Sequence, residues 1–120
     1  MTRYTEEEYQ ALLHRQKGKD RQPKTGFEAV TEAQLQDQTR QAALWTGWSF
    51  YHTHDSRKSD EDFPDCIMLR PPRWLVVELK KEGQYPTPGQ NLWLELFKRC
   101  GAETYVWRPS DIYRIMEILR

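Results

Sequence analysis

The chain has 120 residues, with 18 Lys and Arg against 18 Asp and Glu, so its formal net charge at pH 7 is zero. That length suits one domain, and the neutral total excludes a protein that holds nucleic acid by a basic surface alone. Aromatic residues make up 12% of the chain, which argues against wholesale disorder. No apolar run approaches the roughly 20 residues of a membrane-spanning helix, so we expect no membrane association. Two cysteines, Cys66 and Cys100, are too few for a disulfide scaffold; we predict a reducing compartment and buried thiols.

The amino-terminal part of the chain is predicted to lie outside the main domain. Residues 1–16 have the capping-box spacing and narrow apolar stripe of a short helix. Residues 17–26 are basic and contain Gly and Pro, as in a linker or an exposed arm. We therefore predict an N-terminal helix with a basic arm over 1–29 and a single domain over 30–120.

The domain is predicted to begin with a helix that starts at Thr31 and stops near Gly47. Thr31 and Gln34 have capping-box spacing, and Gly is common just after a helix end. Its buried face, predicted from helical spacing, is Leu35, Gln38, Ala42 and Trp45. An aromatic segment over 48–54 is predicted to be a strand, and the polar segment 55–62 a loop.

A β-hairpin is predicted next. Residues 65–69 and 74–80 are both apolar strand candidates, and Pro71 and Pro72 lie in the turn between them. Proline cannot continue a hydrogen-bonded ladder, so the two strands are expected to pair as antiparallel neighbours.

A well-marked helix follows the hairpin. Thr87 is its predicted N-cap, Pro88 its first residue and Gln90 the partner in a capping box, and Gly101 ends it. Its predicted apolar stripe is Leu92, Trp93, Leu96 and Phe97, with Trp93 in the core.

The chain ends with a strand and a helix. Residues 103–107 are predicted to form the strand, with Trp107 in the core, and Ser110 to cap the final helix. The inward side chains of that helix are predicted to be Ile112, Ile115, Met116 and Leu119. The order of elements predicts an α/β domain with a mixed β-sheet flanked by helices.

Two acidic residues and a lysine form the pattern that is most informative about chemistry. Asp65 opens one strand of the hairpin, and Glu78 and Lys80 point to one face of the other strand. Paired as predicted, Asp65 lies near Glu78, and such carboxylates repel unless a cation lies between them. The same spacing also describes a half-exposed strand whose Glu78 and Lys80 face water, so both interpretations stay open.

The carboxylate interpretation predicts a hard divalent cation. Oxygen ligands favour Mg²⁺ or Mn²⁺ over Zn²⁺. Such an ion neutralises a phosphate, lowers the pKa of a water ligand and stabilises a leaving oxygen. Lys80 could orient the attacking water or stabilise the charge that develops on the phosphate. Together these groups suit the hydrolysis of a phosphodiester.

The chain resembles a compact VRR-NUC domain, a branch of the PD-(D/E)xK nuclease superfamily, in versions from bacteria and their phages. The residues that carry the resemblance are Glu32, Phe63-Pro64-Asp65, Glu78-Leu79-Lys80, Thr87-Pro88-x-Gln90 and parts of 51–59, 93–94 and 101–111. It covers residues 30–111 and implies a restriction-endonuclease-like core.

The resemblance implies a role for each residue of the central motif. Asp65 and Glu78 would be metal ligands and catalytic residues, with the backbone carbonyl of Leu79 as a third ligand. Lys80 would be the catalytic lysine.

Two further residues receive a catalytic role from the resemblance and also have a structural alternative. Glu32 would act on the metal directly or through a water molecule; otherwise it is a first-turn acid favoured by the helix dipole. Gln90 would contact the lysine, the water or a substrate phosphate; otherwise it serves only the capping box. The sequence departs from the family at Asp62, where glycine is common, which would reshape the approach to the metal loop or add negative charge there.

Histidines and basic residues near the motif are candidate DNA contacts. His52 and His54 share a strand face, but no third residue has the spacing of a zinc ligand, and polar strand-end residues are the alternative. The candidates are His52, His54, Arg57, Lys58 and Lys81. Basic residues at 15–24, 57–58, 70–73 and 80–81 are expected to bracket the acidic pocket.

The resemblance implies a Mg²⁺- or Mn²⁺-dependent DNA endonuclease. By analogy with junction resolvases, we expect a homodimer that cuts branched DNA, such as a four-way junction, in the cytoplasm of a bacterial or phage-infected cell. One alternative is a nicking, flap or restriction-type nuclease with the same site. Another is a non-catalytic DNA-binding module with a nuclease-like fold.

Overall fold

The computed structural model describes Thr5, Glu7, residues 26–54 and residues 60–120. The helix predicted over 1–16 and the basic arm over 17–26 fall almost entirely outside the described residues, as do Arg57 and Lys58. The boundary between arm and domain therefore stays a prediction.

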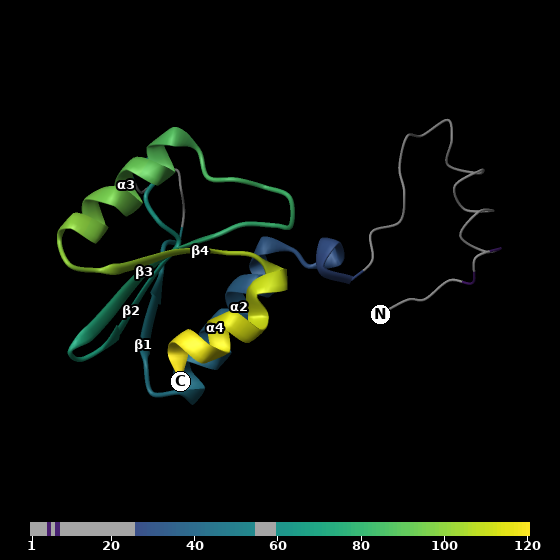
Figure 1. Cartoon of the computed structure of the whole chain (residues 1–120), viewed down its shortest axis with the longest axis horizontal. Helices are drawn as coiled ribbons and strands as arrows, with labels where there is room; N and C mark the ends of the chain where they lie inside the picture. Colours follow the sequence, from purple (N-terminus) through teal and green to yellow (C-terminus); the bar gives the residue numbers. More distant parts are fainter. Residues whose placement is uncertain (1–4, 6, 8–25, 55–59) are drawn as a thin grey trace.

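A four-stranded mixed sheet forms the centre of the domain (Figure 1). Its strands, in spatial and chain order, are β1 (Ser49–His52), β2 (Cys66–Arg70), β3 (Arg73–Leu79) and β4 (Glu103–Trp107). The first three strands are antiparallel neighbours, and β4 runs parallel to β3. A parallel pair needs a crossover connection, which helix α3 (Pro88–Arg99) supplies. The α/β class and the mixed sheet are as predicted.

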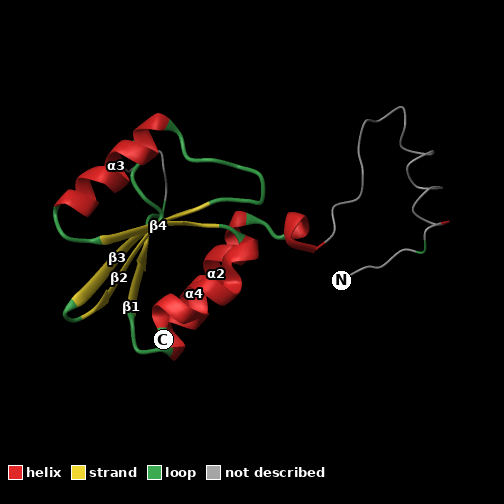
Figure 2. Ribbon diagram, in the orientation of Figure 1, coloured by secondary structure: helices red, strands yellow, loops and turns green. Residues whose placement is uncertain are grey.

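Helices cover both faces of the sheet, as Figures 1 and 2 show. Helix α3 lies on one face, where Val76, Leu94 and Ala102 form a small buried cluster. Helices α2 (Glu32–Trp45) and α4 (Ile112–Leu119) lie on the other face. The larger core between them and the sheet includes Leu35, Ala43, Met68, Leu75, Val77, Trp107, Ile115 and Leu119. Strand β3 is therefore buried on both sides.

Helix α2 begins at the predicted residue but turns a different face to the core. The Gln34 N–H donates to Thr31 Oγ1 over 3.1 Å and the Thr31 N–H to Gln34 Oε1 over 2.9 Å, so the capping box is confirmed. Its buried residues are Leu35, Thr39, Ala42 and Ala43. The predictions for Gln38 and Trp45 were wrong, because both side chains lie to the side of the buried face of the helix and are exposed. Trp45 is 89% exposed.

The predicted hairpin is confirmed, with each strand shifted by one residue. Arg70 lies opposite Arg73 across a turn formed by Pro71 and Pro72, whose peptide bond is cis. The neighbouring strand β1 is shorter than the predicted 48–54.

The two hairpin arginines do not bracket the acidic pocket, as had been expected of residues 70–73. Arg70 Nη1 donates to the carbonyls of Thr46 and Leu119 over 2.9 and 3.0 Å, and both arginine side chains lie over the Trp48 ring. Arg73 and Glu78 are at opposite ends of β3, which separates them by roughly 17 Å at 3.3 Å per residue. The two arginine side chains therefore hold the ends of helices against the sheet.

Helix α3 starts at its predicted cap, and Gly101, with φ +93°, follows its C-cap Cys100. Its stripe was only partly predicted. Leu94 is buried, although the predicted stripe omitted it, whereas Leu92 and Leu96 are 60% and 44% exposed. The helix meets the domain through Trp93 and Phe97, which are half-buried against the Phe63 ring, so Trp93 is not a fully buried core residue.

The final helix begins differently from the prediction. A short 3-10 turn, Pro109–Asp111, precedes α4, and no side chain caps α4. The Ser110 N–H donates to Glu82 Oε1 over 2.6 Å, while Asp111 Oδ2 accepts from the Arg108 N–H over 2.9 Å. The prediction of Ser110 as the cap was therefore wrong, because Ser110 lies inside the 3-10 turn and the residue at the N-cap position of α4 is Asp111.

Of the other side chains that were predicted to be buried, some are buried and others are exposed. Cys66 and Trp107 are buried as predicted. Cys100 is exposed because it lies at the outer end of α3, and Met116 is 40% exposed on the outer side of α4. In the described part of the chain, no helix is both long and apolar enough to cross a bilayer.

Candidate active site

Asp65 and Glu78 come together at the end of the hairpin that is farthest from its turn. Cys66 pairs with Val77, so Asp65, one residue earlier, lies beside Glu78 on the neighbouring strand. The Leu79 N–H donates to Asp65 Oδ2 over 2.8 Å, which fixes the Asp65 carboxylate against β3. The predicted convergence of Asp65 and Glu78 follows directly from the antiparallel pairing.

The other side of Asp65 is fixed by the residue that follows β1. The Thr53 N–H donates to the Asp65 carbonyl and the Thr53 hydroxyl to the Pro64 carbonyl, each over 2.8 Å. Pro64 itself is buried. Sequence reasoning did not select Thr53, and a lone Thr near a strand end carries no signal that would have found it.

Glu78 is a buried carboxyl group. Only 2% of the residue is exposed, and its Oε2 atom has no hydrogen-bond partner within the described part of the chain. Its pKa is raised by burial first and then by the hydrogen bond and the negative charge of Asp65, while Lys80 opposes the shift. Glu78 therefore does not face water, and the half-exposed interpretation of this strand is excluded.

The two carboxylates fit a divalent cation. They offer hard oxygen atoms, and an unpartnered buried oxygen is costly unless a proton or a cation satisfies it. Among the described residues, no three His, Cys, Asp or Glu side chains are grouped to hold an ion. Any further ligands would have to be water or backbone oxygen, such as the Leu79 carbonyl of the sequence prediction.

Lys80 lies beside the pair, on the face of the sheet that Glu78 also occupies. Its Nζ atom is 3.9 Å from Glu78 Oε1, and its side chain is 15% exposed. The Lys80 N–H donates to the Trp107 carbonyl over 2.9 Å, which continues the β3–β4 ladder past the end of β3. The backbone therefore aims a positive charge at the carboxylates. Lys81, the next residue, is half-buried.

The other two predicted catalytic residues lie at helix starts. Glu32 is the exposed first residue of α2, and its charge also contributes to the raised pKa of Glu78. Gln90 is in the first turn of α3, where its Oε1 accepts from the Thr87 N–H over 2.8 Å. The structural alternatives are thus both present: Glu32 as a first-turn acid and Gln90 as the capping partner.

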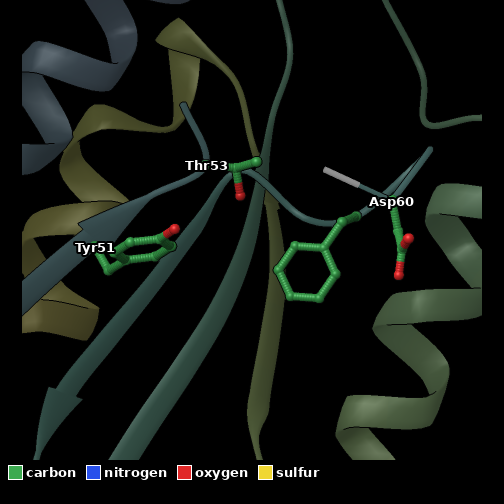
Figure 3. A pocket seen from close by; sticks show the side chains of 4 residues that line it. Tyr51, Thr53 and Asp60 are labelled. Atoms are coloured by element: carbon green, nitrogen blue, oxygen red, sulfur yellow. The ribbon is translucent and has the colours of Figure 1, made fainter. Parts of the chain in front are cut away.

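A hollow of about 220 Å³ has in its lining Thr53, the residue whose N–H donates to the Asp65 carbonyl. Its lining residues are Tyr51, Thr53, Asp60 and Phe63. Figure 3 shows Tyr51 and Asp60 on opposite sides of the hollow, with Thr53 between them. His52 and His54 are close together nearby, with ring centroids 4.4 Å apart, although β1 ends at His52. Of the three other candidate DNA contacts, Arg57 and Lys58 are outside the described residues, and Lys81 follows Lys80.

No protein-family model and no curated protein matches the sequence. A solved structure of a VRR_NUC domain does match, with a TM-score of 0.62 and 23% sequence identity. The match covers 74% of this chain and 97% of that chain. The chain therefore has the restriction-endonuclease-like α/β fold of a VRR_NUC domain, as the sequence resemblance implied.

Proposed function

We propose that the protein is a metal-dependent endonuclease that hydrolyses DNA phosphodiesters. The observation that carries the proposal is the convergence of Asp65 and buried Glu78, with the Lys80 ammonium 3.9 Å from Glu78. Carboxylates that repel each other are unfavourable in a structural element, and they would repel the phosphates of a bound nucleic acid. A divalent cation held by the two carboxylates would remove both costs.

Asp65 and Glu78 would hold Mg²⁺ or Mn²⁺, with the Leu79 carbonyl as a backbone ligand. When bound, the ion supplies neutralisation of the phosphate and activation of water for attack on phosphorus. Asp65 is prepared for this role by the Leu79 N–H, which already orients its carboxylate. Glu78 is prepared by burial, since water does not compete for its oxygen atoms.

Lys80 would supply the positive charge that the reacting phosphate needs. Its ammonium group donates hydrogen bonds but cannot accept them. It would therefore orient a water molecule through its oxygen or stabilise phosphate oxygens as negative charge develops. Glu32 would act from α2 on the metal, directly or through a water molecule. Gln90 would use its amide NH₂ group toward the water, the lysine or the phosphate, because its carbonyl oxygen already serves the cap.

The substrate we favour is branched DNA, such as a four-way junction, cut by a homodimer in the cytoplasm of a bacterial or phage-infected cell. This step rests on analogy with junction resolvases of the superfamily. Five residues, two of them the adjacent histidines, would contact the DNA around the site: His52, His54, Arg57, Lys58 and Lys81. The hollow lined by Tyr51 and Phe63 offers aromatic rings to a base beside the cut.

The test compares the cleavage of junction, flap, nicked and linear duplex DNA in Mg²⁺, Mn²⁺ and EDTA. We expect cleavage only with the metals and fastest for the junction. Asp65→Asn should abolish it, and Asp37→Asn, a control at an exposed acid on α2, should not. Faster cutting of another substrate would replace the junction by that specificity. DNA binding without cleavage under all conditions would make the protein a binding module.

The dimer is tested separately by measuring mass in solution. A homodimer would have twice the chain mass of 14.4 kDa. A monomer at high micromolar concentration would contradict paired cutting of opposed strands.

A further inference from the structure

The carboxylate of Asp62 lies at the start of α3. The Thr87 hydroxyl donates to Asp62 Oδ1 over 3.0 Å, and Thr87 is the N-cap of that helix. The same hydroxyl oxygen accepts from the Gln90 N–H over 3.1 Å. Asp62 therefore orients the hydroxyl group that caps the helix carrying Gln90, and its negative charge faces the positive end of the helix dipole.

Gly89 is the counterpart of this contact on α3. A Cβ atom at position 89 would overlap the Asp62 carboxylate, with Asp62 Cγ only 2.7 Å away and Asp62 Cβ 3.1 Å away. The backbone φ of Gly89 is not positive, so conformational freedom does not require glycine there. What requires the absence of a side chain is the close approach of Asp62.

The backbone of Asp62 is itself in an unusual conformation. Its φ is +67°, in the left-handed region, and it is the one non-glycine residue with positive φ in the described part of the chain. This conformation is unfavourable for most L-residues, although Asp and Asn tolerate it because of local hydrogen bonding. An Asp here keeps the turn that glycine would allow and adds a carboxylate.

We propose that Asp62 is a positioning residue that ties the loop carrying Asp65 to the start of the helix carrying Gln90. Thr53 holds this loop on the β1 side, and Asp62 holds it on the α3 side. Only two residues separate Asp62 from Asp65, so a displaced Asp62 moves the Asp65 carboxylate relative to β3. That its purpose is to align catalytic groups rests on the proposed function; the tie itself does not.

A double-mutant cycle tests the tie. Gly89→Ala should destabilise the wild-type protein in urea unfolding, because the new Cβ displaces the Asp62 carboxylate. In an Asp62→Gly background, which keeps the turn and removes the carboxylate, Gly89→Ala should be neutral or stabilising. We expect the unfolding constants to show non-additivity of about tenfold, as for contacting residues. Additive effects would overturn the proposal.

Amide hydrogen exchange tests the positioning of Asp65 and needs neither metal nor DNA. The Leu79 amide donates to Asp65 Oδ2, whereas the next amide, Lys80, donates to the Trp107 carbonyl and serves as the matched control. Asp62→Gly should speed exchange at Leu79 by about tenfold, the value of one hydrogen bond, and leave Lys80 unchanged. Equal change at both amides, or none at Leu79, would contradict positioning.

The conservative variant and the wild-type activity complete the test. Asp62→Asn keeps the left-handed turn and an acceptor for the Thr87 hydroxyl, so it should restore slow exchange at Leu79. Failure of Asn to restore it would overturn the hydrogen-bond account. Wild-type protein that shows the coupling but cuts no DNA would refute the proposed function and leave the tie between the loop and α3 standing.

Discussion

The carboxylate of Asp65 accepts the backbone N–H of Leu79 over 2.8 Å, across the end of the β2–β3 hairpin. This bond uses an amide that would otherwise continue the strand ladder, and it holds the Asp65 carboxylate against β3, next to Glu78. The electrostatic cost falls on Glu78, whose buried Oε2 is unpartnered within the described residues and whose pKa is raised. Burial of this carboxyl group is therefore unfavourable when it is charged, and the first two predictions follow from that.

Glu78→Gln should raise the free energy of unfolding in EDTA. A carboxyl group whose pKa is raised by folding destabilises the folded state as pH rises above its unfolded pKa of about 4.3, so the gain should be larger at pH 8 than at pH 5. Urea unfolding at the two pH values measures it. A variant that is less stable than wild type at pH 8 would contradict a strained apo site.

Glu78→Gln should also remove stabilisation by metal. Saturating Mn²⁺, at 100 times its dissociation constant, should add about 2.7 kcal/mol to the stability of the wild type. The amide of Gln is a poorer ligand for a hard cation, so the variant should gain little. Thermal unfolding with and without Mn²⁺ checks this, and Glu117→Gln, at an exposed acid of α4, is the control that should respond as wild type.

Lys80→Ala should lower the rate of DNA cleavage by a factor of about 10² to 10³, the effect of losing one charge-stabilising group in a catalytic site. Lys98→Ala, which removes an exposed lysine from the last turn of α3, is the matched control and should cut at the wild-type rate. Single-turnover cleavage measures the chemical step. Equal rates for wild type and Lys80→Ala would make the catalytic assignment of Lys80 wrong.

Glu103→Gln should destabilise the protein near neutral pH and much less in acid. Arg73 donates to both carboxylate oxygens of Glu103, over 2.7 and 2.8 Å, and this bond lowers the pKa of Glu103. The stabilisation is present above the unfolded pKa and is lost as pH falls through the lower folded pKa. Because the pair is about one-third exposed, we expect less than about 1 kcal/mol at pH 7. The measurement is the urea midpoint of wild type and of Glu103→Gln at pH 7 and at pH 2.5. A difference between the two proteins that persists at pH 2.5 would argue against this ion pair.

The two cysteines should differ in reactivity. Cys100 is exposed, whereas Cys66 is fully buried and its thiol pKa is raised by burial and by the charges of Asp65 and Glu78. The thiolate is the reactive form, so a thiol reagent at pH 8 should label one cysteine in the native protein and two in urea. Mass spectrometry of Cys100→Ser, which should remain unlabelled when folded, identifies the site.

Local interactions were well predicted from the sequence. Both capping boxes join residues three apart, Thr31 with Gln34 and Thr87 with Gln90, and the hairpin turn at Pro71-Pro72 depends only on its own backbone. The alternation of β3 likewise placed Glu78 and Lys80 on one face. Such features arise within a few residues, so they do not depend on how the elements pack.

The burial and the contacts of several side chains were decided by the packing of the elements, and the sequence did not predict them. Trp45 and Leu96 were expected to be inside, but the small residues Ala42 and Ala43 and the aromatic contact of Phe97 set the helix orientations instead. The hairpin arginines were expected to bracket the acidic pocket, but they bind helix ends at the opposite end of the sheet.

The sequence by itself determined the mixed α/β architecture and the strand pairing that places Asp65 beside Glu78. Only the tertiary structure decided that Glu78 is buried. Helix α3 packs over one face of β3, and α2 and α4 pack over the other, so water is excluded from both faces. The alternation of residues in β3 would by itself also suit a half-exposed strand. The tertiary structure also decided that Asp62 meets Thr87, twenty-five residues away. Burial and long-range contact depend on elements distant in the chain, and no local pattern of residues encodes them.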